Sequence, residues 1–214
     1  MRTMPATGMR AWLASGVPSP LPLALERECG LAAGSGWGYV LSLGSNDRAE
    51  TRLVAALTLL ARRYGALIVS RVYSTKAAGN QAGGARFLNL AVYLRSPMSP
   101  RRLKTELQRI ESHLGRRRSA DGAALPVSID LDILVGPLDG AASLDNAYWR
   151  TLPTFIQRPM HEIMTALNTT AQPAPAKPGP LRELNIDGWR IGHAPILLRM
   201  YGDHRITTAG PVAH

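Results

Sequence analysis

Residues 128–135 read Ser-Ile-Asp-Leu-Asp-Ile-Leu-Val, and the assignment of the fold starts from this stretch. Apolar and acidic residues alternate in it with a period of two, which is typical of a β-strand with two different faces. The apolar residues would point to one face, and Asp130 and Asp132 to the other. Two carboxylates side by side repel each other unless a cation lies between them. The pattern therefore indicates either a metal site, for which oxygen ligands suit Mg²⁺, or an edge strand with a solvated acidic face.

Strand and helix signals alternate along the chain before this strand. In chain order, the sequence predicts a strand over residues 37–43, a helix ending at Gly65, a strand over residues 66–73, a strand over residues 87–94, a helix between Pro100 and Gly115, and the acidic strand. The order βαββαβ is that of the ferredoxin-like fold, an α+β architecture. We expect an antiparallel sheet with both helices packed on one face, which leaves the other face and its loops for a ligand.

The composition allows one domain of ordinary size with a hydrophobic core. The chain has 214 residues, of which 45% are hydrophobic, and its net charge is +10 with a pI of about 10.6. A basic balance fits an anionic partner, such as nucleotide phosphates or nucleic acid. Cys29 is the only cysteine. This excludes an intramolecular disulfide and a cysteine-cluster metal site, and it fits a reducing compartment.

The chain divides into four parts by composition. Residues 1–36 lack periodicity and are interpreted as a loosely ordered or disordered extension, followed by a domain over residues 37–170. Residues 171–180 form a proline-rich linker, and residues 181–214 form a tail that we expect to pack back on the domain. No apolar run approaches the ~18 residues of a membrane-spanning helix. We therefore expect a cytoplasmic protein with no membrane partner.

Five groups of short motifs occur in one order over residues 38–168. They are Leu43-Gly44-Ser45-Asn46, Tyr73-Ser74-Thr75 with Gly79, Phe87-Leu88-Asn89, Gln108-Arg109-Ile110-Glu111 with Gly115-Arg116, and Ile129-Asp130-Leu131-Asp132-Ile133-Leu134. With these motifs in this order, the chain resembles the 6-hydroxymethyl-7,8-dihydropterin pyrophosphokinase (HPPK) family of folate synthesis. The resemblance implies an enzyme that transfers a pyrophosphoryl group from ATP to the hydroxymethyl oxygen of the pterin, with AMP as the leaving group.

The resemblance also implies a role for each motif. The acidic pair Asp130 and Asp132 would hold two Mg²⁺ ions between ATP and the pterin hydroxyl, and would form the catalytic centre together with Arg116 and Arg118. ATP would contact Gln108, Glu111 and Ile133 as well. Without the resemblance, each arginine just past a helix end could equally serve to complement the helix dipole.

The resemblance places the pterin contacts on the predicted strand over residues 87–94 and in the loop before it. By the resemblance, Phe87 would stack on the ring, Asn89 would read its edge and Thr75 would contact it. An aromatic residue in a strand is as often part of the core, so this alternative stays open for Phe87. An amide offers both a donor and an acceptor, which suits Asn89 to a ring edged with both.

Several family positions carry different residues in this chain. Val127 stands where the family has an arginine that contacts phosphate, and Lys76 stands where it has a proline. Near the third helix, Gln157, Ile163 and Thr165 stand at the positions of a histidine, an arginine and a phenylalanine. By the resemblance, several phosphate and stacking contacts are therefore lost, while the metal pair is retained.

Three functions are compatible with these residues. The first is an active pterin pyrophosphokinase, which the retained metal pair favours. The second is a diverged homologue that binds pterin or nucleotide with little catalysis, which Val127 favours. The third is a nucleic-acid-binding module, and two carboxylates on the sheet argue against it because they repel a phosphate backbone. We expect small-molecule substrates, no nucleic-acid partner and a monomer.

Overall fold

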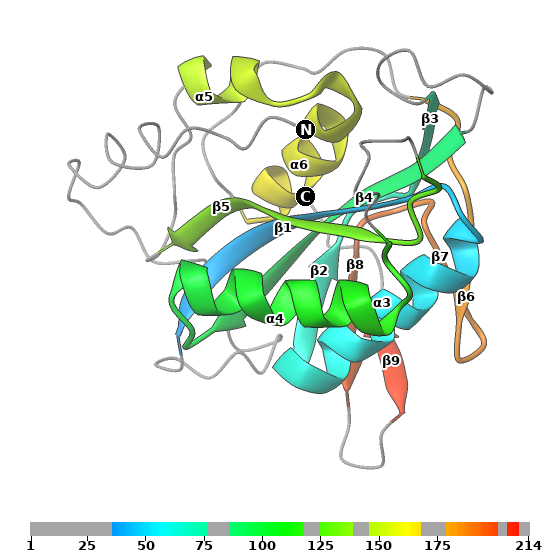
Figure 1. The fold of residues 1–214 in the computed structure, drawn as a ribbon, viewed down its shortest axis with the longest axis horizontal. Coiled ribbons are helices and arrows are strands. Elements are labelled where there is room, and N and C mark those ends of the chain that lie inside the picture. Colours follow the sequence, from blue (N-terminus) through cyan, green and yellow to red (C-terminus); the bar gives the residue numbers. More distant parts are fainter. Residues whose placement is uncertain are drawn as a thin grey trace.

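The computed structural model describes residues 36–76, 86–117, 125–138, 146–167, 179–200 and 205–209. Figure 1 shows the chain as a twisted sheet with helices on both sides. The elements, in chain order, are β1 (Trp37–Ser45), α3 (Ala49–Tyr64), β2 (Ala66–Val69), β3 (Tyr73–Lys76), β4 (Arg86–Ser96), α4 (Pro100–His113), β5 (Asp130–Leu138), α5 (Asn146–Thr151), α6 (Thr154–Ala166), β6 (Leu184–Ile186), β7 (Trp189–Ile191), β8 (Ile196–Met200) and β9 (Ile206–Ala209).

The central strands confirm the predicted ferredoxin-like arrangement. They lie in the order β5-β1-β4-β2, and each neighbouring pair is antiparallel. The predicted strand over residues 66–73 is two strands, because Ser70 leaves the β2 ladder and its hydroxyl accepts the Ala91 N–H at 2.9 Å. The following β3 pairs with the other end of the long strand β4. The expected packing of the tail on the domain is also found, since β8 pairs with β2 and β9 with β8.

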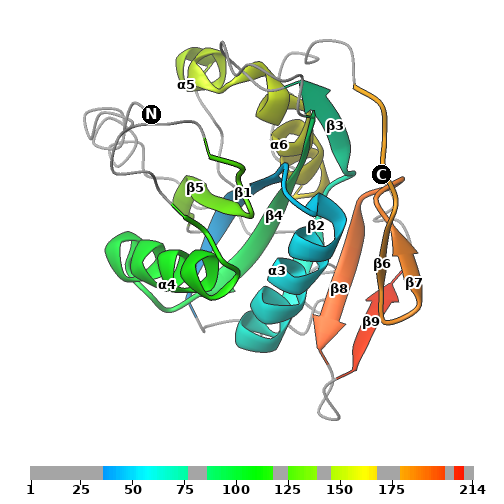
Figure 2. The same cartoon turned by 45° about the vertical axis from the view of Figure 1, so that its right-hand side comes forward.

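Helices α3 and α4 pack side by side on one face of this sheet, as Figures 1 and 2 show. Their leucines meet the inward residues of the central strands in the first core cluster, which includes Leu41, Leu57, Leu90, Leu107 and Leu131. Helix α3 ends where predicted, at Gly65, whose N–H donates to the Ala61 carbonyl. Burial of both leucine stripes fixes the two helices relative to β5.

A third helix, α6, covers part of the opposite face of the sheet (Figure 2). It buries the second core cluster, in which strand residues meet Ile156, Met160 and Ile163 of the helix; the strand residues are Val40, Ala66, Ile68, Ala91, Tyr93, Val135, Leu138 and Leu197. The face that the sequence leaves for a ligand is therefore divided. One half is an apolar contact with α6, and the other half carries the polar residues described next.

Candidate active site

One row of residues runs across four strands on the α6 side of the sheet. In the strand register, Tyr73 of β3 lies opposite Asn89 of β4, Asn89 opposite Gly44 of β1, and Gly44 opposite Asp130 of β5. Residues directly opposite each other on adjacent strands present their side chains to the same face. The fold therefore brings an amide and a carboxylate to one surface, on either side of a glycine. Asp132 lies one step further along β5 on the same face.

The residues predicted to contact a pterin lie together at one end of this row. The side-chain nitrogen Nδ2 of Asn89, a residue only 3% exposed, donates to Thr75 Oγ1 at 2.7 Å. A Cβ on Gly44 would lie 2.8 Å from Asn89 Oδ1, so only glycine leaves room for the amide. Phe87 lies opposite Thr75, is half-buried, and belongs to neither core cluster of the described residues. Phe87 and Thr75 therefore lie on the same face of the sheet as Asn89.

The two carboxylates lie at the other end of the row, at the edge of the sheet. Burial, the neighbouring Asp132 carboxylate and the Glu111 carboxylate all raise the pKa of Asp130. Two cations oppose this effect. Arg116 Nη2 lies 3.7 Å from Asp130 Oδ1, and Lys104 Nζ lies 2.6 Å from Asp132 Oδ1. Positive charge close to the pair therefore partly offsets the repulsion between the two carboxylates.

The donor set of this pair suits Mg²⁺ held partly by a substrate. Within the described ranges, no group of three or more His, Cys, Asp or Glu residues is placed to hold a metal ion. Asp130 and Asp132 thus offer two protein ligands, and the remaining ligands would be phosphate oxygens and water, which is how Mg²⁺ is usually bound in nucleotide enzymes. Burial and then repulsion by Asp132 and Glu111 raise the pKa of Asp130, and a divalent ion would relieve the repulsion.

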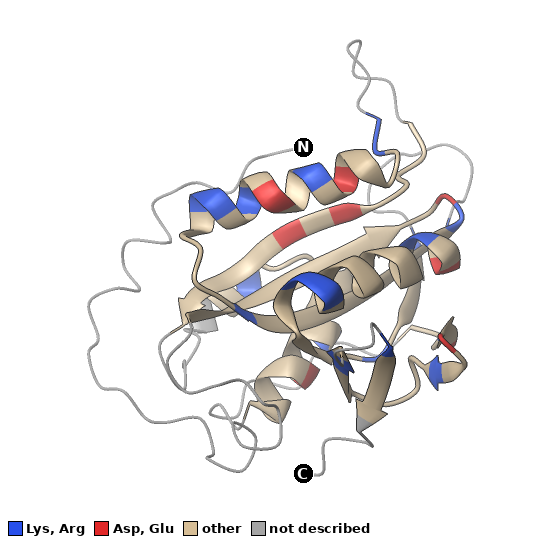
Figure 3. Ribbon diagram, turned by 90° about the horizontal axis from the view of Figure 1, so that it is seen from below, with Lys and Arg blue, Asp and Glu red and all other residues tan. Residues whose placement is uncertain are grey.

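The residues predicted for ATP lie on helix α4 and on strand β5 beside it. Gln108 is exposed, and Ile133 packs against the first core cluster. Glu111 is only 2% exposed, and its Oε1 accepts the Leu131 N–H at 2.7 Å. Arg118 lies outside the described residues. Figure 3 shows the acidic positions of β5 beside α4, on which basic and acidic residues alternate.

Lys104 is a residue of this edge that the sequence prediction missed. Its Nζ donates to the Leu131 carbonyl at 3.0 Å as well as to Asp132. Lys104, Gln108 and Glu111 follow one another at spacings of four and three, so they form one stripe of α4. That spacing was the signal that could have identified Lys104.

Replacement of Glu111 by leucine is expected to destabilise the fold by about 1–3 kcal/mol, because the buried Leu131 N–H would lose its acceptor. Glu111→Gln keeps an acceptor of the same size and should recover most of this loss. The measurement is the free energy of unfolding in urea. Equal stability of the leucine and glutamine variants would contradict the role of this hydrogen bond.

Hydrogen bonds of Ser45 and Asn46 connect the turn after β1 to the loop before β5. Asn46 Oδ1 accepts the Val127 N–H at 2.6 Å, and the Val127 carbonyl accepts the Asn46 N–H at 3.0 Å. The Ser45 hydroxyl donates to the Ser128 carbonyl at 2.6 Å. Val127 itself is buried. The position at which the resemblance expects an arginine is therefore a packed part of this loop.

Two further positions at which the chain departs from the expected pattern have structural contacts on α6. Gln157 Nε2 donates to the Leu152 carbonyl at 2.9 Å, and Ile163 is part of the second core cluster. In the same helix, the buried Glu162 accepts from the Tyr73 hydroxyl and from the Arg71 N–H. Because Tyr73 lies opposite Asn89, this network supports the row from the α6 side.

Comparison with known families gives a match that covers most of the described core. The model of the family 7,8-dihydro-6-hydroxymethylpterin-pyrophosphokinase (HPPK) matches residues 40–165. The chain belongs to the HPPK family. The matched segment contains the whole row and both helices of the ferredoxin-like core, whereas β8 and β9 follow it.

Relatives named as HPPK enzymes are similar to part of the chain. A 2-amino-4-hydroxy-6-hydroxymethyldihydropteridine pyrophosphokinase from Porphyromonas gingivalis (strain W83) is 41% identical over 99 residues, which are 44% of this chain and 66% of the relative. The enzyme of that name from Bacillus subtilis (strain 168) is 38% identical over 99 residues, 44% of this chain and 57% of the relative. The match thus spans slightly less than two thirds of the first relative's length. None of the helices in the described part of the chain is long and apolar enough to cross a membrane.

Proposed function

We propose that this HPPK-family chain transfers a pyrophosphoryl group from MgATP to 6-hydroxymethyl-7,8-dihydropterin, or to a related pterin alcohol. The hydroxymethyl oxygen attacks the β-phosphorus of ATP and loses its proton. The bond between the β-phosphorus and the oxygen that bridges it to the α-phosphorus breaks, and AMP leaves with that oxygen. Such a transfer depends mainly on positioning and on neutralising phosphate charge.

The row across the sheet is the observation that supports this proposal. Asn89 and Asp130 are two strands apart on one face, with Gly44 between them. Since adjacent strands are about 4.8 Å apart, the two positions are separated by roughly 10 Å. This spacing suits a flat two-ring heterocycle whose edge meets Asn89 and whose hydroxymethyl arm reaches the carboxylates. Thr75 and Phe87 extend the same surface.

The ATP side of the proposal rests on α4 and the end of β5. Gln108 and Ile133 would contact the adenosine part, and Arg116, beside Asp130, would contact phosphate. Glu111 would act at least in part through the Leu131 N–H that it holds. Bound Mg²⁺ would neutralise phosphate oxygens and lower the pKa of the pterin hydroxyl. The cytoplasmic location, monomeric state and lack of a nucleic-acid partner remain predictions.

The function is tested by AMP release from MgATP, measured with and without 6-hydroxymethyl-7,8-dihydropterin. We expect AMP formation that requires both the pterin and Mg²⁺. Pterin-independent hydrolysis, or no AMP at any pterin concentration, would contradict the proposal. In the second case, pterin or nucleotide binding in calorimetry would favour the alternative of a homologue with little catalysis, for which the buried Val127 is the supporting observation.

A further inference from the structure

Each carboxylate of the acidic pair has its own cation, but the two contacts differ. Arg116 Nη2 lies 3.7 Å from Asp130 Oδ1, which is beyond a hydrogen bond. Lys104 Nζ lies 2.6 Å from Asp132 Oδ1, within a short charge-assisted hydrogen bond. The side chains of Lys104 and Asp132 are 34% and 44% exposed, so both are accessible from solvent. The ammonium group thus occupies one acceptor position of Asp132 Oδ1.

A divalent ion bound to Asp132 and this ammonium group would repel each other. Mg²⁺ binds carboxylate oxygens at about 2.1 Å, where it would meet a like charge held 2.6 Å from the same atom. Lysine can withdraw without any change of the backbone, because its charge is carried on a flexible four-carbon stem. The second acceptor of Lys104, the Leu131 carbonyl at 3.0 Å, keeps the side chain at the edge of β5.

We propose that Lys104 is a positioning residue that neutralises Asp132 while no divalent ion is bound and withdraws from it when one binds. Lys104 thereby sets the divalent-ion concentration at which the acidic pair is filled. The inference rests on the proposed function in so far as MgATP is the natural source of the ion. The contacts of Asp132 support it without reference to ATP, and Mn²⁺ binding can be measured with neither ATP nor pterin.

The test is Mn²⁺ binding to the full chain, followed by the loss of the free-ion signal in electron paramagnetic resonance. Lys104→Met removes the competing cation, and we expect Mn²⁺ to bind about fivefold more tightly. Lys104→Gln should shift the Mn²⁺ affinity in the same direction. It keeps a donor for the Leu131 carbonyl, so it tests the proposal even if the methionine variant does not fold. Lys104→Arg keeps the charge, and its affinity should stay within about twofold of the original chain.

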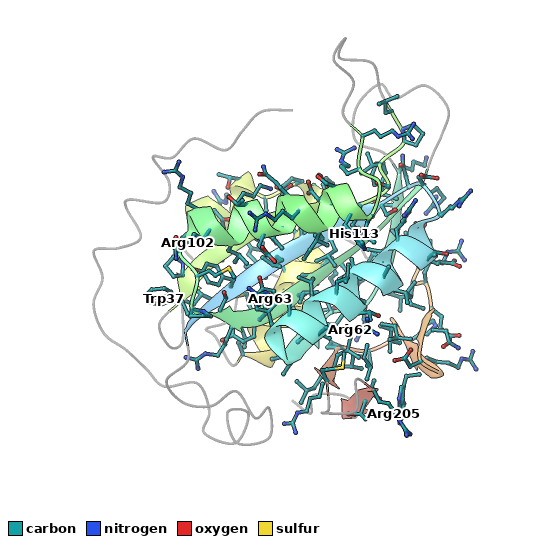
Figure 4. The ribbon with its side chains drawn as sticks, turned by 60° about the horizontal axis from the view of Figure 1, so that its bottom comes forward. Trp37, Arg62, Arg63, Arg102, His113 and Arg205 are labelled. Atoms are coloured by element: carbon teal, nitrogen blue, oxygen red, sulfur yellow. The ribbon has the colours of Figure 1, made fainter. Side chains whose placement is uncertain are left out.

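The matched control is Arg102→Met, which removes the same charge from the same helix. Arg102 lies two residues from Lys104, or about 200° around the helix, and its side chain is exposed (Figure 4). We expect this variant to change Mn²⁺ affinity by less than about twofold. An equal gain in both variants would overturn the proposal, because it would show only a general effect of net charge. Unchanged or weaker binding by Lys104→Met and Lys104→Gln would overturn it as well.

The same Mn²⁺ measurement in an Asp132→Asn variant tests whether Lys104 acts through Asp132. In Asp132→Asn, removal of Lys104 should bring no gain in Mn²⁺ affinity, because the two residues act on the same oxygen. A gain there would contradict displacement from Asp132. Failure of the wild-type chain to form AMP would reject the pyrophosphokinase proposal but would leave the Mn²⁺ result for Lys104 intact.

Discussion

Replacement of Asp132 by asparagine is expected to lower pterin-dependent AMP formation by on the order of a thousandfold. A metal ion contributes several kcal/mol of charge stabilisation in the transition state, and each 1.36 kcal/mol corresponds to a factor of about ten in rate. An amide holds a divalent ion far more weakly than a carboxylate. The same loss is expected for Asp130→Asn, since the two side chains share one face of β5. A rate within about tenfold of wild type for either variant would contradict the proposed metal site.

Thermal unfolding without Mg²⁺ supplies the control for this prediction. Because the pKa of Asp130 is raised above its ordinary value of 3.8, the folded chain binds this proton more readily than the unfolded chain. Stability from this group is present below that value and is lost as the pH rises through the raised pKa. At pH 7, Asp130→Asn should therefore unfold at the same temperature as wild type or higher, and the difference should shrink near pH 3. If Asp130→Asn were strongly destabilised at pH 7, unfolding would instead explain its loss of activity.

The second large effect is expected for Gly44→Ala, which should weaken pterin binding about 10- to 100-fold. The added Cβ would lie 2.8 Å from Asn89 Oδ1, so the amide must turn away from its present position. Its hydrogen bond to Thr75 would then be lost, and the amide would no longer be oriented toward the ring edge. The measurement is the dissociation constant of the pterin in the presence of Mg²⁺ and a non-hydrolysable ATP analogue.

A double-mutant cycle distinguishes this mechanism from a general loss of structure. Asn89→Ala should weaken pterin binding by a similar factor. The double variant should be little worse than either single variant, because both changes remove the same oriented amide. Fully additive losses, or an unchanged pterin affinity of Gly44→Ala, would show that the glycine does not act through Asn89.

The sequence predicted the acidic strand because its two faces differ, and it predicted β1 and β4 because their apolar runs are buried on both faces. Ile129 and Leu131 are fully buried, so a shift of one residue would place the two aspartates in the core. The packing of α6 on the opposite face was not predicted. The apolar stripe of α6 shows that one side of the helix is buried, but it does not show against which face of the sheet the helix packs. Local periodicity also could not show that Ser70 divides one expected strand into β2 and β3.

The site was predicted in part, and the resemblance supplied the larger share. Asn89 and Thr75 meet as hydrogen-bonded partners, and the row through Gly44 links them to Asp130. Residue spacing alone could not show this, because the contact depends on the register of three strand pairs. Glu111 was predicted for ATP, and its buried hydrogen bond to Leu131 shows an additional task in holding β5.

Strand β5 ends the sheet on one side, so the backbone groups of Leu131 that point outward are a potential template for another chain. Glu111 and Lys104 occupy both of them, one at the N–H and the other at the carbonyl. The side chains that serve the proposed nucleotide site therefore also protect this edge from self-association. Lys104→Met would expose this carbonyl, and its tendency to aggregate should exceed that of Lys104→Gln, which keeps a donor for it.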